Sequence, residues 1–140
     1  MSVNVATSAS PSKAWTIGLW VLQVLLAAMF GMAGTMKATA PITQLAANMP
    51  WVAELPALVR FIGIAELAAA LGLILPAATR ILPFLTPLAG AGLALIMVLA
   101  AGFHGMRGEY GSIGMNVLLG ALAILVAWGR FVKAPVSPRN

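Results

Sequence analysis

"RFIGIAELAAALGLILP", residues 60–76, is an almost unbroken apolar run that contains one carboxylate, Glu66. Such a run is typical of a helix that spans a membrane. An acidic residue at the centre of a spanning helix costs roughly 2.5–3.5 kcal/mol on insertion scales. The stretch therefore predicts a bilayer as the surrounding solvent and raises the question of what stabilises Glu66.

The composition of the whole chain also points to a bilayer. Of its 140 residues, 61% are hydrophobic and only 8% are charged, and the mean hydropathy is +1.01. A soluble domain carries about 25% charged residues, so this chain has too few to cover a surface in water. Apolar and polar residues do not alternate along the sequence, which excludes a transmembrane β-barrel.

The charged residues divide the chain into apolar intervals. No charge lies between Lys13 and Lys37, and only Glu66 lies between Arg60 and Arg80. Each interval reaches or nearly reaches the ~20 residues that cross the hydrocarbon core. We therefore expect an all-α, polytopic membrane protein, a four-transmembrane-helix up-down bundle. Its predicted helices are about 15–36, 57–75, 84–104 and 112–130.

The segments around these helices have their own signatures. Residues 1–13 and 133–140 are predicted to be disordered tails around a membrane domain, 14–132. The apolar run of the first helix is longer than the 7–15 residues of a signal peptide, so we interpret it as an anchor. Ile42, Leu45 and Met49 recur at helical spacing in the linker "PITQLAANMPW". This linker is either a short amphipathic helix or an irregular loop with its apolar residues in the headgroups.

The basic residues set the expected orientation. A net charge of +5 suggests nucleic acid as the partner of a soluble protein, but here the lipid bilayer is the expected partner and nucleic acid is not. With both termini inside, the cations of the inner side are Lys13, Arg80, Arg130, Lys133 and Arg139. Those of the outer side are Lys37, Arg60 and Arg107. The positive-inside rule thus favours an integral protein of the bacterial inner (plasma) membrane with cytoplasmic termini.

Under this topology, polar side chains gather in the outer half of the bundle: Lys37, Arg60, Glu66, His104, Arg107, Glu109 and Asn116. The pattern indicates a polar site with Glu66 at its floor. Each member also has a structural explanation. Lys37 and Arg60 can snorkel to the headgroups, and His104 is favoured at a helix C-terminus. Asn116 can join two helices, and Glu66 can form an ion pair with Lys37.

Small residues form a stripe along each helix, which in lipid favours close helix packing. The stripe of the first helix comprises Gln23, Ala27, Gly31, Gly34 and Lys37. Gln23, Glu66 and Asn116 lie on such stripes, so we expect all three to face the bundle.

Several of these stretches resemble the DoxX-like family. "MFGMAGTMKATA" resembles the Gly-x-x-Lys ending of its first helix, and "RFIGIAELAAALGLILPAATR" its second-helix pattern, Arg-x-x-Gly-x-x-Glu before a Gly-Leu-x-Leu-Pro exit. The resemblance covers about residues 15–131 and implies a four-helix integral membrane protein. It also implies that Lys37, Arg60, Glu66, His104 and Asn116 occupy the family's polar positions. The family takes its name from a subunit of a thiosulfate:quinone oxidoreductase, and other members are membrane partners of redox or detoxifying enzymes.

Three functions fit this sequence. The first is a quinone-linked redox protein or redox-complex subunit, with Glu66 and His104 as catalytic proton carriers. Its substrate- or cofactor-binding residues would be Lys37, Arg60, Asn116 and Gln23. The second is a noncatalytic anchor or accessory partner of another redox or detoxifying enzyme. The third is a small-solute carrier, although carriers usually show inverted repeats or broken helices. The sequence leaves open whether the chain is itself an enzyme and whether it forms a homo-oligomer.

Among cofactors, quinone is the candidate. We expect no haem, because the single histidine would be the sole axial ligand of its type, and the chain has no cysteine. We also expect no metal, because Glu66, Glu109 and His104 do not follow a metal-ligand spacing. Another redox protein subunit is the expected protein partner.

Overall fold

The computed structural model describes residues 10–140, and within them every regular element is helical. The first part of the predicted N-terminal tail, residues 1–9, lies outside the described residues. Four long helices follow one another: α1 (Lys13–Thr39), α3 (Pro56–Thr79), α4 (Leu85–Met106) and α5 (Tyr110–Trp128). α5 continues as a π-helical turn, η2 (Gly129–Lys133). All four are long and apolar enough to cross a membrane, which confirms the predicted all-α membrane fold.

The helix ends follow from local sequence. Ser12 caps α1 by accepting a hydrogen bond from the Trp15 amide at 3.3 Å. Pro56 opens α3 at a position where its missing N–H is not needed. Arg80 ends α3 in the left-handed conformation, and the chain turns into α4.

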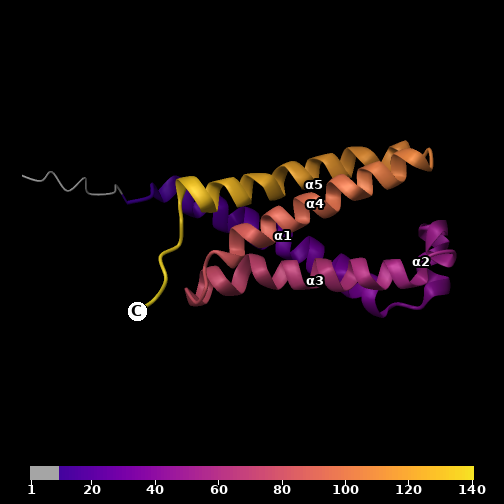
Figure 1. The fold of residues 1–140 in the computed structure, drawn as a ribbon, viewed down its shortest axis with the longest axis horizontal. Coiled ribbons are helices and arrows are strands. Elements are labelled where there is room, and N and C mark those ends of the chain that lie inside the picture. The colour runs from indigo at the N-terminus through magenta and orange to yellow at the C-terminus, as the bar shows by residue number, and fades with distance from the viewer. Residues whose placement is uncertain (1–9) are drawn as a thin grey trace, which may run out of the picture.

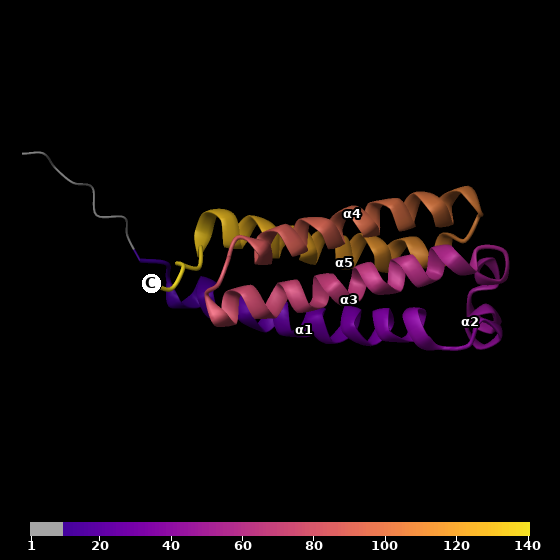
Figure 2. The same ribbon diagram turned by 60° about the horizontal axis from the view of Figure 1, so that its bottom comes forward.

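The helices run up and down in two antiparallel pairs, α1 with α3 and α4 with α5 (Figure 1). α3 packs on α4 and joins the pairs, while α1 and α5 touch only slightly. Both described chain ends lie at one end of the bundle (Figure 2). In the view of Figure 1 the two pairs diverge toward the opposite end, where α2 lies.

The linker between α1 and α3 is helical. It forms α2 (Ile42–Asn48) and the 3₁₀ turn η1 (Pro50–Ala53). Leu45 is buried with Trp51, Val52 and Val59 in a small apolar cluster. The linker is therefore helical, which is the first of the two alternatives that the sequence leaves open, and it packs on this end of the bundle.

Glycine sets the distance between α1 and α3. A Cβ on Gly34 would lie 2.7 Å from the Gly63 carbonyl oxygen, and one on Gly63 would lie 2.8 Å from that of Gly34. The two backbones thus touch at this crossing, which only glycine permits. Lys37 follows Gly34 by about one turn of α1, and Glu66 follows Gly63 by about one turn of α3.

Large apolar side chains cover the outside of the bundle, among them Met32, Phe61, Val98 and Leu99. Such a surface would be unfavourable in water and suits hydrocarbon. The core between the helices contains Leu26, Phe30, Leu73, Leu93 and Met97.

The C-terminal tail has no regular secondary structure but does make defined contacts. Arg80 donates to the Ser137 carbonyl at 2.8 Å and to the Pro138 carbonyl at 3.0 Å. The Arg139 amide donates to the Arg80 carbonyl at 3.0 Å. The prediction of a disordered end did not include these contacts, because they depend on a residue far away in the sequence.

Candidate functional site

The close approach of α1 and α3 brings Lys37 and Glu66 together. The Lys37 ammonium donates to both carboxylate oxygens of Glu66, at 2.8 and 2.9 Å. The Glu66 side chain is 1% exposed and that of Lys37 is 22% exposed. A counter-ion with two hydrogen bonds offsets much of the cost of a carboxylate at this depth.

Arg60 lies beside this pair but serves the end of α1. Its guanidinium donates to the carbonyls of Lys37 at 2.9 Å and Ala40 at 2.7 Å. The last carbonyls of a helix lack partners within it and carry partial negative charge, so an arginine there is favourable. Arg60 therefore holds the backbone of Lys37 and does not line the cavity described next.

A cavity of about 310 Å³ lies between the helix pairs at the α2 end. α3 and α4 provide most of its walls, including Phe61, Ile62, Ile96, Met97 and Phe103, and Met49 lines it from the junction of α2 and η1. Five polar or titratable side chains also line it: Lys37, Trp51, Glu66, His104 and Asn116. The cavity is thus mostly apolar with a few convergent polar groups, as ligand sites usually are.

Two hydrogen-bond donors at this cavity have no partner among the described residues. They are Trp51 Nε1 and Asn116 Nδ2, and both atoms are buried. A buried donor without a partner costs about 1–3 kcal/mol, and native proteins contain few of them. Both atoms belong to residues that line the same cavity.

His104 connects the cavity to the surface. Its Nδ1 lies 2.6 Å from Glu109 Oε2, and Arg107 Nε donates to Glu109 Oε1 at 3.0 Å. The hydrogen bond from His104, and then that from Arg107, holds the pKa of Glu109 below its ordinary value. With Glu109 ionised, Nδ1 of the His104 ring is the donor of this hydrogen bond.

The profile of the DoxX-like family matches residues 21–126, most of the chain. This chain belongs to the DoxX-like family. No curated protein and no solved structure matches it. The match includes all six predicted site residues, and it ends before Arg130.

The structure of this DoxX-like protein brings Lys37, Glu66, His104 and Asn116 together at the cavity, but not Gln23. Gln23 is fully buried. It lies on α1 about 20 Å from Lys37, at a helical rise of 1.5 Å per residue. Its side chain donates to the Leu73 carbonyl at 2.5 Å and accepts from Arg130 at 2.6 Å. It faces the bundle as expected, yet it belongs to the opposite end.

Among the polar or titratable residues that line the cavity, Trp51 is the one that the sequence did not assign to the site. Tryptophan at the end of a span has an ordinary interfacial role, so nothing in the pattern distinguished it. Its position depends on η1, where its ring packs edge to face on Phe103 at 5.3 Å. Within residues 10–140, no three His, Asp or Glu side chains lie close enough to hold a metal ion.

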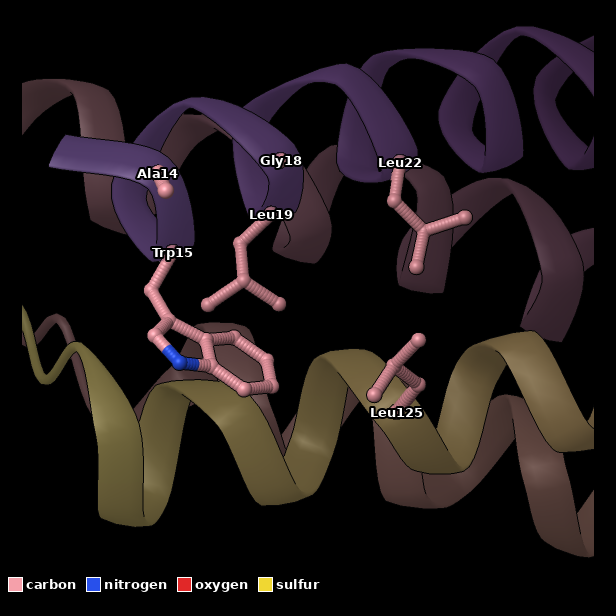
Figure 3. A pocket seen from close by; sticks show the side chains of 6 residues that line it. All are labelled: Ala14, Trp15, Gly18, Leu19, Leu22 and Leu125. Atoms are coloured by element: carbon pink, nitrogen blue, oxygen red, sulfur yellow. The ribbon is translucent and has the colours of Figure 1, made fainter. Parts of the chain in front are cut away.

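A second hollow, of about 330 Å³, lies between α1 and α5 at the end with the chain termini (Figure 3). The residues drawn there are Ala14, Trp15, Gly18, Leu19 and Leu22 of α1 and Leu125 of α5, all without charge. This hollow has about the same volume as the polar cavity, but it carries no titratable group. The polar cavity is therefore the candidate site of this DoxX-like protein.

Proposed function

We propose that this DoxX-like protein is the quinone-binding membrane subunit of a redox complex. The observation that carries the proposal is a mostly apolar cavity lined by Trp51, Asn116 and Glu66, in which Trp51 and Asn116 each carry a side-chain donor without a partner among the described residues. A quinone head group is flat and apolar and has two carbonyl oxygens that accept hydrogen bonds. It therefore fits both the walls and the donors of this site.

The position of the cavity suits a lipid-soluble ligand. Phe61 and Leu99 line it, and both are also largely exposed on the outside of the bundle, at 70% and 64%. Because that outside faces hydrocarbon in a membrane protein, a hydrophobic molecule can reach the cavity from within the bilayer. A water-soluble substrate would not use this route.

Protons can reach the same site. A quinone, when bound, accepts two electrons and two protons to form a quinol. The Lys37–Glu66 pair holds a proton at the cavity, and His104 with Glu109 leads from it to the surface. In this proposal a partner redox protein donates the electrons.

One observation favours the second function, a noncatalytic anchor or accessory partner. Lys37 fully satisfies Glu66, which is what a structural ion pair between two helices requires. The pair alone, however, gives no reason for the unpartnered donors. For that reason quinone binding is preferred.

The test is binding of a short-chain benzoquinone to the purified protein, together with extraction of its bound lipids for quinone. Trp51→Phe and Asn116→Leu each remove one unpartnered donor. We expect each to weaken binding about three- to tenfold, the effect of one hydrogen bond. Thermal stability should stay equal or increase, because a buried unpaired donor disappears.

Trp128→Phe is the matched control, because Trp128 does not line the cavity. It should leave quinone affinity unchanged. A wild-type protein that carries no quinone and shows no saturable binding would overturn the proposal. Equal weakening by all three variants would show that the binding is not at this cavity.

A further inference from the structure

A second buried polar cluster lies at the other end of the bundle, around Arg130. This side chain is 4% exposed, and two of its nitrogens are held in place. Nε donates to Gln23 at 2.6 Å, and Nη1 donates to the Ala134 carbonyl at 3.1 Å. Gln23 is in turn anchored on the Leu73 carbonyl of α3. The orientation of the guanidinium is therefore fixed by three separate parts of the chain.

The third nitrogen has no partner. Nη2 of Arg130 is buried and makes no hydrogen bond within residues 10–140. The only acidic residues of the sequence are Glu54, Glu66 and Glu109. Glu66 is paired with Lys37, and the other two lie near Arg107 at the opposite end. A buried guanidinium without a counter-ion is strongly unfavourable, and the Trp20 ring, 5.4 Å away, is a much weaker partner than an anion.

A pocket of about 260 Å³ is lined by Arg130. Its other walls include Pro83 in the loop before α4, Pro87 at the start of α4, and Pro135 and Pro138 of the C-terminal tail. Proline has no backbone N–H, so these walls offer few donors that compete with Arg130. Arg80 holds the tail in place through the carbonyls of Ser137 and Pro138.

We infer that this pocket binds a phosphate group, with the Arg130 guanidinium as its counter-ion. Guanidinium matches phosphate in charge and geometry. Arg130 lies near the end of the span Tyr110–Lys133, at the level where phospholipid headgroups are found. Arg80, Lys133 and Arg139 add positive charge to this end, which attracts anionic lipid. The inference concerns a site separate from the quinone cavity and does not depend on it.

The experiment measures thermal unfolding and native mass spectra of the full chain in a neutral detergent. Phosphatidylglycerol, phosphatidylcholine and inorganic phosphate are titrated separately. We expect phosphatidylglycerol to raise Tm in a saturable manner and to remain bound in the spectra, with phosphatidylcholine much weaker. If inorganic phosphate saturates the same shift and phosphatidylglycerol adds nothing, the phosphate site stands and its source is the free ion.

Arg130→Gln should reduce the affinity for phosphatidylglycerol about tenfold or more, the effect of one charged hydrogen bond. Lys133→Gln is the matched control, because it removes a cation from the same turn as Arg130. The Lys133 ammonium lies over the rings of Trp15 and Trp128 and does not line the pocket. This variant should change the affinity less than about twofold, as expected of an exposed charge. Equal effects of both variants, or equal binding of the two lipids, would overturn the inference.

A variant that ends at Ala134 covers the case in which Arg130→Gln does not fold. It keeps Arg130 and its contact with Ala134 but removes the tail that walls the pocket. We expect this variant to remain folded and to lose retained phosphatidylglycerol. Unchanged retention would contradict the pocket as the site.

Discussion

At the scale of single residues, the stability of Glu66 depends on one ammonium group. Lys37 supplies both of its hydrogen bonds, and no other cation contacts the carboxylate among the described residues. Both residues also line the cavity, so the same pair serves the fold and the candidate site. Stability measurements can separate these two roles.

Lys37→Met should destabilise the protein by about 3–5 kcal/mol, because it leaves a buried carboxylate without a counter-ion. The double variant Lys37→Met, Glu66→Met should recover part of this loss, since apolar replacement of a buried pair is often neutral. Thermal unfolding in detergent measures both values. A double variant no more stable than Lys37→Met would show that the pair does not act as a unit.

Glu66→Gln is expected to stay folded but to lose proton exchange with a bound quinone.

How far the sequence predicted the site differs from residue to residue. Glu66, His104 and Asn116 were predicted because a polar group in an apolar span is costly and demands a reason. Trp51 and Arg130 were not, because aromatic and basic residues at span ends are ordinary. Arg60 was predicted to bind a ligand, whereas its observed contacts are with helix-end carbonyls. Sequence thus identifies unusual residue types better than unusual contacts.

At the scale of helices, the small-residue stripes predicted the packing only in part. Gly34, Gly63 and Gly90 do lie at close backbone crossings. On α1, however, the buried face also includes the large side chains Leu26 and Phe30, while Gly31 and Ala27 are only partly buried. In a helix this rich in small residues, several faces carry a similar pattern. Only the partner helix selects one of them.

Gly34→Ala tests the crossing of α1 and α3. The new methyl group would meet backbone atoms of Gly63 and Leu67 at 2.7 and 2.8 Å, and backbone cannot move aside as a side chain can. We expect a loss of about 1–3 kcal/mol in unfolding free energy and a weaker Lys37–Glu66 pair. Gly18→Ala is the control on the same helix, because its Cβ would meet nothing within 4 Å. It should be neutral or stabilising by up to about 1 kcal/mol. Equal losses for both would contradict the crossing.

At the scale of the whole molecule, the two ends of the bundle differ in charge. The end with the chain termini carries Lys13, Arg80, Arg130, Lys133 and Arg139 and no acidic residue. At the α2 end, Lys37, Arg60 and Arg107 are accompanied by the acidic residues. The up-down arrangement places both ends of the described chain on one side, as the number of spans predicted. The excess of cations at that side favours the cytoplasm.

Cysteine labelling tests this orientation cleanly, because the chain contains no cysteine. Single cysteines at Gln44 and Ser112, both exposed at the α2 end, should react with an impermeant maleimide added to intact cells. Cysteines at Ser10 and Ser137 should react only after the membrane is opened. The result also assigns each of the two proposed sites to one side of the membrane. With the predicted pattern, His104 and Glu109 exchange protons with the outer side and the Arg130 pocket faces the inner leaflet. The reverse pattern would move both sites to the opposite sides, and the quinone site would then draw its protons from the cytoplasm.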